Sequence, residues 1–309
     1  MKKSVWLLLL TALAVNACSR PQKGLELTIV GDIMLSRGVE TAIQERGMET
    51  LLEDLKPVFL EDDLSIANLE CPITDYGRGT SKPRRLVFKA DPANTRYLKE
   101  AGLDLLNLAN NHAMDYHSQG LTDTMEHLNN AGLCYVGAGS DSSQDMSYVF
   151  EKNGIRVGVL AYSLFGPEGF SYSPHRANLN YLLPPHYEKL KEDLEGLQAD
   201  VKSVYFHWGI EFVPYLSDTQ KELGHLAVDY GADFVVGTHP HVIQKMEVYQ
   251  GKYIYYSLGN CIFDHQIPRG TDEGLLLSVK VNKSGVQEVK ERRFKIQRGK
   301  AVLEQEQPE

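Results

Sequence analysis

Residues 234–241 read Phe-Val-Val-Gly-Thr-His-Pro-His, an apolar run that ends in two histidines one residue apart. A short run of β-branched and aromatic residues predicts a strand, and the glycine that follows predicts its end. In open α/β folds, functional side chains lie just beyond the carboxyl ends of strands. His239 and His241 therefore stand where such a site is built, and imidazole is a common metal ligand.

Four other apolar runs end in polar side chains of the same kind. The runs are residues 25–30, 64–67, 103–108 and 201–206. The side chains that follow them are Asp32; Asn68 and Glu70; Asn110, Asn111, His112 and Asp115; and His207, Trp208 and Glu211. A single group of this kind is more often a capped turn or a satisfied polar residue. Five groups at five strand ends predict one shared metal or catalytic site.

The order of predicted elements indicates an α/β fold. Helical patterns at 39–59, from 91 onwards, and at 120–130, 184–197 and 218–230 alternate with predicted strands. From residue 242 the chain turns mostly to strands, at 242–249, 253–257, 274–282 and 286–297. We therefore expect one domain with a mixed two-sheet core and added C-terminal antiparallel strands.

The first residues are typical of a bacterial lipoprotein signal. Lys2 and Lys3 precede an apolar segment that ends at Cys18. We expect a signal peptide over 1–17, lipidation of Cys18, a tether over 18–24, a domain over 25–300 and a tail over 301–309. The protein would then be extracytoplasmic and anchored to the membrane. A plain secretory signal cut near Ala17, or an uncleaved anchor, is the alternative.

Composition and charge exclude several classes of protein. Hydrophobic residues make up 42% of the chain and charged residues 24%, which is typical of a globular protein rather than a disordered one. The formal net charge is −9, so no nucleic acid is expected as a partner. Cys71, Cys134 and Cys261 lack the paired spacing of a thiolate zinc site, and we expect three buried thiols.

The motifs in order are GD, NxE, NNHxxD, HWGxE, GTHPH and SLGN. Together they resemble the bacterial capsule-synthesis family typified by CapA, the poly-γ-glutamate capsule protein. That family looks like a branch of the calcineurin-like metallophosphatase superfamily. The resemblance implies an αββα sandwich, two sheets flanked by helices. It covers about residues 25–265.

The resemblance also implies roles for individual residues. His112 and Asp115 would be catalytic residues, with His112 as the acid that protonates a leaving oxygen, and Glu70 would bridge two ions. The metal ligands would be Asp32, Glu70, Asn111, His207, His239 and His241. We group His207, His239 and His241 with Glu70 or Asn111 as one histidine-rich position, and Asp32 with Glu70 as a weaker one.

This mixture of carboxylate, imidazole and amide ligands suits Mn, Fe or Zn better than Mg or Ca. Met34 stands where the phosphatases have a histidine, and Asn68-Leu69-Glu70 replaces their Gly-Asp-x-x-Asp. Two ions, one ion or none are therefore open alternatives.

Six further residues are expected in the pocket: Asn68, Asn110, Trp208, Glu211, Ser257 and Asn260. Glu211 orients a ligand or is merely solvated, and Ser257 with Asn260 lines the rim or forms a turn. The loop at 75–89 carries Lys82, Arg84, Arg85 and Lys89, which either meet an anionic polymer or form a solvated surface.

Three functions are compatible with these patterns. The first is a membrane-anchored protein that acts in synthesis, export or attachment of an anionic polymer, with a metal-dependent hydrolase site and a membrane complex as partner. The second is a non-catalytic scaffold of such an export complex. The third is a periplasmic phosphatase or phosphodiesterase unrelated to capsule.

Overall fold

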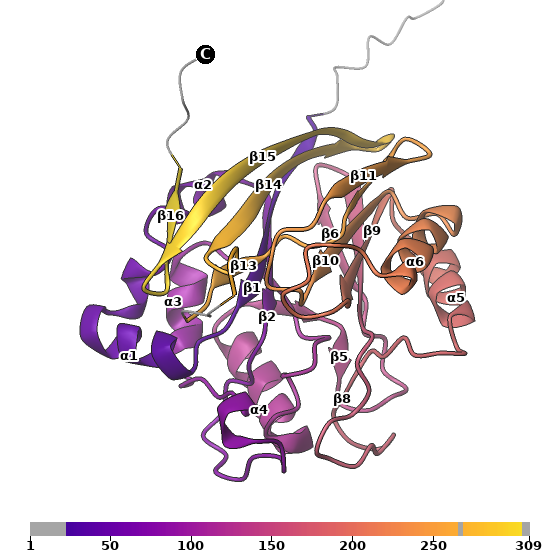
Figure 1. The fold of residues 1–309 in the computed structure, drawn as a ribbon. Coiled ribbons are helices and arrows are strands. Elements are labelled where there is room, and N and C mark those ends of the chain that lie inside the picture. Colours follow the sequence, from indigo (N-terminus) through magenta and orange to yellow (C-terminus); the bar gives the residue numbers. More distant parts are fainter. Residues whose placement is uncertain (1–22, 265–267, 305–309) are drawn as a thin grey trace, which may run out of the picture.

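The computed structural model describes residues 23–264 and 268–304, which form two packed β-sheets with helices on both outer sides (Figure 1). The predicted αββα architecture and its added C-terminal antiparallel strands are confirmed. The predicted signal peptide and Cys18 lie outside the described residues. Within the described part of the chain, no helix combines the length and apolar character needed to span a membrane.

The first sheet has eight strands in the order β16-β15-β14-β1-β2-β3-β4, and β13 pairs with β1. Strands β1 to β4 are parallel, whereas β14, β15 and β16 are antiparallel. The bounds are β1 (Leu25–Ile33), β2 (Leu64–Leu69), β3 (Leu105–Asn107), β4 (Cys134–Val136), β13 (Asn260–Ile262), β14 (Glu273–Asn282), β15 (Gly285–Gln297) and β16 (Lys300–Leu303).

The second sheet has six strands in the order β11-β12-β10-β9-β7-β6. Its central strands β7, β9, β10 and β12 are parallel. The bounds are β6 (Tyr148–Lys152), β7 (Ile155–Ser163), β9 (Val201–His207), β10 (Phe234–Thr238), β11 (Met246–Tyr249) and β12 (Lys252–Tyr255). A separate pair joins β5 (Ala138–Gly139) to β8 (Asn178–Leu179).

The helices cover the two outer faces. Those against the first sheet are α1 (Arg37–Arg46), α2 (Lys56–Glu61), α3 (Asn94–Glu100) and α4 (His117–Asn130), with the short 3₁₀ helices at Met48–Thr50 and Arg84–Leu86 in the same part of the chain. Those against the second sheet are α5 (Glu188–Gly196) and α6 (Asp218–Asp229), at the right of Figure 1.

Alternation along the strands builds three apolar layers. Ile66 belongs to the core between the sheets, whereas its neighbour Ala67 belongs to the core under the helices of the first sheet. On the second sheet, Val204 belongs to the core that contains Leu190 of α5 and Leu223 of α6. Successive side chains of a strand point to opposite faces, so the central strands of each sheet are buried on both faces.

The single helix expected over 39–59 is wrong. The chain forms α1 and α2 with a 3₁₀ turn between them, because Gly47 adopts a φ of 83° and ends α1 with its N–H bonded to the Ile43 carbonyl at 2.9 Å. Pro57 lies in the first turn of α2 instead of ending a helix, since its missing N–H costs nothing there.

Two smaller expectations also need correction. Residues 301–303, assigned to the tail, belong to β16, which pairs with β15. Cys71 and Cys261 are buried free thiols as expected, but Cys134 on edge strand β4 is only half-buried.

Candidate metal centre

A register irregularity in β1 turns Asp32 into the space between the sheets. Ile29 pairs with Ile66 and Asp32 with Asn68, so three steps along β1 match two steps along β2. Because an extra residue reverses the side-chain alternation, Asp32 faces the same side as Ile29 instead of the helices. Gly31 is required within this irregularity, since a Cβ there would lie 1.9 Å from the Gly259 carbonyl oxygen.

Asparagine side chains hold the Asp32 carboxylate. The amide Nδ2 of Asn68 donates to Asp32 Oδ1 at 2.7 Å. Asn107 and Asn110 in turn donate to Asn68 Oδ1, at 3.0 and 3.2 Å. Asn110 also accepts the backbone N–H of His112 at 3.1 Å, so it shapes the turn after β3. Asn68 and Asn110 therefore act through the residues they orient.

Glu70 is the most unusual group of the site. It is completely buried, and neither carboxylate oxygen has a hydrogen-bond partner. Three imidazole nitrogens surround its Oε1: Nε2 of His241 at 3.6 Å, of His207 at 3.8 Å and of His112 at 4.0 Å. Burial, followed by the charge of Asp32, raises the pKa of Glu70 well above its usual value. Buried carboxylates in proteins are paired or bind metal ions.

His207 ends β9 and is fixed by neighbouring strands and loops. Its Nδ1 lies 2.9 Å from Thr238 Oγ1, and its Nε2 lies 2.9 Å from Asn111 Oδ1. Burial, with His239 and His241 nearby, lowers the pKa of His207 well below its usual value. A neutral imidazole is the form that binds a metal ion.

His239 and His241 follow β10 in a strained turn. Their φ values are 95° and 56°, a region that residues other than glycine rarely adopt. Such strain is concentrated at functional sites, because the surrounding structure must impose it. Gly237 makes the turn feasible, since a Cβ there would lie 2.0 Å from the Tyr256 carbonyl oxygen. The Nδ1 atom of His239 is buried and has no hydrogen-bond partner.

His241 lies between Asp32 and Glu70. Its Nδ1 is 2.9 Å from Asn260 Oδ1 and 3.4 Å from Asp32 Oδ2. Burial alone would lower the pKa of His241, but Glu70 and Asp32 outweigh it and raise the pKa to about 9. Asn260 also donates to the backbone carbonyl of Thr271 at 2.9 Å, so it orients the imidazole ring.

The residues present fit metal ions at two adjacent positions. Asp32, Glu70 and His241 offer ligand atoms within 4.8 Å of one another, and so do Glu70, His207 and His239. Ligands bonded at about 2 Å to one ion lie roughly 3–4 Å apart, which matches the spacing around Glu70. Glu70 is common to both sets, so it is placed to bridge. In these two sets His241 groups with Asp32, whereas we expected it at the histidine-rich position.

His112 and Asp115 form a pair beside these positions. His112 Nδ1 lies 2.8 Å from Asp115 Oδ2, and the ionised carboxylate can only accept, so Nδ1 carries the proton. His112 Nε2 is thereby directed at Glu70. Lys82 from the 75–89 loop forms an ion pair with Asp115 and donates to the Asn111 carbonyl at 3.2 Å.

Aromatic rings frame the site, and none of them was expected from the sequence. Phe88 stacks on His112 with centroids 3.9 Å apart, and Phe165 lies 4.1 Å from His239. Phe263 lies 4.7 Å and Phe212 5.9 Å from His241. Phe165 and Phe263 follow strands β7 and β13, so the rule applied to polar residues at strand ends could have found them.

Trp208 and Ser257 do not face the metal centre. Trp208 is buried between the second sheet and its helices, where it stacks on Phe206 and donates from Nε1 to the Tyr256 carbonyl at 2.9 Å. The assignment of Trp208 to the pocket is therefore wrong, because its side chain lies on the opposite face of β9 from His207. Ser257 accepts the Gly259 N–H at 3.3 Å and shapes the turn before β13.

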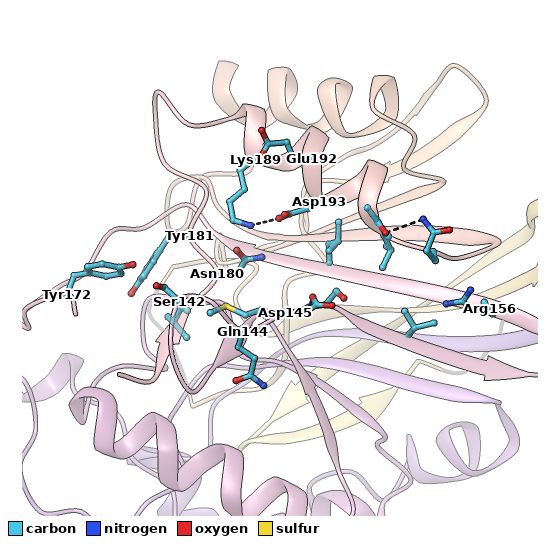
Figure 2. Close-up of a pocket in the computed structure, with 18 residues that line it drawn as sticks. Ser142, Gln144, Asp145, Arg156, Tyr172, Asn180, Tyr181, Lys189, Glu192 and Asp193 are labelled. Atoms are coloured by element: carbon cyan, nitrogen blue, oxygen red, sulfur yellow. Dashed lines mark hydrogen bonds and ion pairs between the residues drawn. The ribbon is translucent and has the colours of Figure 1, made fainter. Parts of the chain in front are cut away.

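Several clefts lie outside the ligand cluster. The cleft in Figure 2 has a volume of about 600 Å³ and is lined in part by Tyr172, Tyr181, Lys189 and Asp193; it contains none of the predicted ligands. A second cleft of about 670 Å³ is lined by Arg37 and by Lys82, Arg84 and Lys89 of the 75–89 loop, together with acidic residues.

The second cleft adjoins the metal centre. Arg37 lies 4.5 Å over the ring of Phe88, which stacks on His112, and Lys82 reaches Asp115.

Comparison with known proteins identifies relatives and shared folds. The family described as "Bacterial capsule synthesis protein PGA_cap" matches residues 26–265. The PGA biosynthesis protein CapA of Bacillus subtilis is 33% identical over 255 residues, covering 82% of this chain and 67% of the relative. The capsule biosynthesis protein CapA of Bacillus anthracis is 34% identical over 264 residues, covering 83% of this chain and 64% of the relative. The chain thus spans about two thirds of the length of these relatives.

Solved structures share the fold. A novel phosphatase from Mycoplasma pneumoniae superposes with a TM-score of 0.56 at 17% identity, covering 89% of this chain and 94% of the phosphatase. A hypothetical protein from Thermus thermophilus gives a TM-score of 0.57 at 16% identity, covering 87% of this chain and 99% of that protein. At such low identity the likeness concerns the fold alone.

Proposed function

Because the chain belongs to the bacterial capsule synthesis protein family, we propose that it acts in the synthesis, export or attachment of an anionic extracellular polymer of the poly-γ-glutamate type. The names of the two relatives support this pathway. Within it, we assign the chain a metal-dependent hydrolytic site. The observation that carries this assignment is Glu70, a buried carboxylate without hydrogen-bond partners among three histidines.

The ligands divide between two positions. Asp32, Glu70 and His241 would hold one divalent ion, and Glu70, Asn111, His207 and His239 would hold the other. Bound divalent ions would supply Lewis acidity to a carbonyl or phosphoryl oxygen. We propose Mn, Fe or Zn, because imidazole and carboxylate ligands occur together here.

His112 has the geometry of a general acid. Its Nδ1 proton is held by Asp115, and its Nε2 is directed toward Glu70 and the ligand cluster. In hydrolysis of a phosphoester or an amide-like bond, water adds to the phosphorus or the carbonyl carbon, and the bond to the leaving oxygen or nitrogen breaks. His112 would deliver the proton from Nε2 to that leaving atom in its doubly protonated form, and the proton that the attacking water releases would return Nε2 to that form.

The second cleft, which contains Arg37, Lys82, Arg84 and Lys89, offers a surface for an anionic polymer. Arg84 is exposed in this cleft, Lys89 is half-buried, and Lys82 and Arg37 connect the cleft to His112 through Asp115 and Phe88. Cationic side chains attract a polyanion and raise its local concentration. We propose that polymer enters along this loop.

We further propose that the protein is anchored in the cell envelope as a lipoprotein and works beside a membrane synthesis or export complex. The support for this is the pattern of residues 1–18, which end in Cys18. Anchoring would keep the site at the surface where the polymer emerges.

A scaffold without catalysis is the second candidate, and Met34 favours it. Met34 is completely buried in the core beneath α1, and its sulfur accepts the Ser36 N–H at 3.1 Å. Met34 therefore offers no metal ligand where the phosphatase pattern has a histidine.

Metal content separates the two candidates. We expect the purified protein to bind two Mn ions per chain after chelator treatment and reloading. Glu70→Gln should lose both ions because it removes the shared carboxylate, whereas Asp32→Asn should spare the position of His207 and His239. Elemental analysis after gel filtration measures this.

The control is His225→Gln on α6. It removes an imidazole whose Nε2 lies 3.1 Å from the Glu247 carboxylate. This variant should keep the metal content of the wild type. If the wild-type protein binds no Mn, Fe or Zn, the metal-dependent function is wrong and the non-catalytic scaffold is favoured.

A further inference from the structure

We propose that Glu211 is an additional metal ligand, which closes the mouth of the centre and compensates for the histidine absent at Met34. The inference rests on the metal site proposed above. It concerns a residue that the family of phosphatases, as carried over above, gives no ligand role.

The first observation is the position of the Glu211 carboxylate. Glu211, His239 and His241 offer ligand atoms within 4.8 Å of one another. His241 belongs to the position of Asp32, and His239 belongs to the position of His207. Glu211 is exposed, whereas the two histidines are buried, so the carboxylate approaches both positions from the solvent side.

The second observation is an unpartnered nitrogen below it. His239 is buried, and its Nδ1 has no hydrogen-bond partner. A buried polar atom without a partner costs free energy unless a ligand satisfies it. An ion that binds His239 would satisfy this imidazole, and Glu211 offers a ligand atom within 4.8 Å of those of His239 and His241.

The third observation is the rigidity of the loop that carries Glu211. Gly209 and Phe212, two residues before and one after, have φ values of 89° and 64°. The N–H of Phe212 donates to the Pro240 carbonyl at 2.8 Å, which ties the loop to the turn between the two histidines. Positive φ at a phenylalanine is strained, so the surrounding structure must hold it.

A buried amide pair secures the far side of the loop. Gln244 donates from Nε2 to the carbonyls of Val213 and Tyr215 at 2.9 and 3.2 Å. Gln220 of α6 donates to Gln244 Oε1 at 2.8 Å. Glu211 is thus held on a braced turn, unlike a glutamate on a free surface.

The ligand count explains what Glu211 would add. The position of Asp32 has three protein ligands, Asp32, Glu70 and His241, because Met34 is turned into the core. Glu211 would supply a fourth from the solvent side. A carboxylate on the open side would also restrict which substrates reach the ions.

The test is Mn²⁺ binding to the whole protein by isothermal titration, with elemental analysis after gel filtration. Glu211→Gln keeps the size of the side chain and removes its charge. We expect the affinity of one Mn²⁺ to fall tenfold or more while the other ion is retained. We also expect the visible bands of the cobalt-loaded variant to change in intensity, since they report the number of ligands.

The matched control is Glu222→Gln, which makes the same change of charge at an exposed residue of α6. It should match the wild type in both measurements, and thermal unfolding of all variants checks that each is folded. If the wild type binds two ions and Glu211→Gln binds them with affinities within twofold, the role of Glu211 is overturned and the metal site stands. If the wild type and Glu70→Gln both bind none, the metal site fails and the inference with it.

Discussion

His112 shows how a single residue acquires a role from its neighbours. Phe88 covers one face of the ring, and Asp115 holds Nδ1. Burial lowers the pKa of His112, and Asp115 partly opposes this. The ring is therefore oriented with Nε2 toward the ligands and is placed to exchange a proton with a substrate.

His112→Asn should separate proton transfer from metal binding. General acid catalysis contributes about 10²–10⁴-fold, so turnover of bis(p-nitrophenyl) phosphate or a γ-glutamyl peptide by the loaded protein should fall within that range. Metal content should stay that of the wild type because His112 belongs to neither ligand set. Loss of an ion in this variant would instead make His112 a ligand.

At the scale of elements, the irregularity in β1 decides which layer receives Asp32. The strand is predictable from its apolar residues. The sequence of residues 25–33 does not indicate, however, that three residue steps along β1 pair with two steps along β2. The irregularity is created by tertiary pairing, since β13 comes from far along the chain and packs against Gly31 through Gly259.

Gly31→Ala tests this arrangement. The added methyl group would overlap the Gly259 carbonyl, so we expect the free energy of unfolding to fall by about 1–3 kcal/mol or more. Urea unfolding monitored by circular dichroism measures the change. Gly77→Ala is the control, because a Cβ at Gly77 meets no atom within 4 Å. Equal stability of the two variants would show that the close approach is not required.

At the scale of the whole molecule, the parallel strands of both sheets direct their carboxyl ends to one edge, where distant segments meet. Asp32 and Glu70 come from the first sheet, and His207, His239 and His241 come from the second. The proposed anchor residue, Cys18, lies outside the described residues.

Cys18→Ala tests the anchor. Without the thiol, lipid attachment and processing should fail, and we expect the protein to leave the detergent phase in phase partitioning or to accumulate as precursor. Cys134→Ala removes a half-buried thiol on β4 and should not change partitioning. Unchanged membrane attachment of the Cys18 variant would falsify the lipoprotein hypothesis.

The sequence by itself predicted an α/β chain with a mixed two-sheet core and polar groups at the strand ends, because apolar strands and the polar residues after them are local patterns. The αββα arrangement and the six expected ligand residues came from the family resemblance. His112 and Asp115 were both expected as catalytic residues, and the structure shows that they form a pair. Trp208 was misplaced, and the division of Glu70, His239 and His241 between two positions was not foreseen. Those features depend on strand register, on the face that each side chain takes and on distances between the two sheets, and only the tertiary structure decides these.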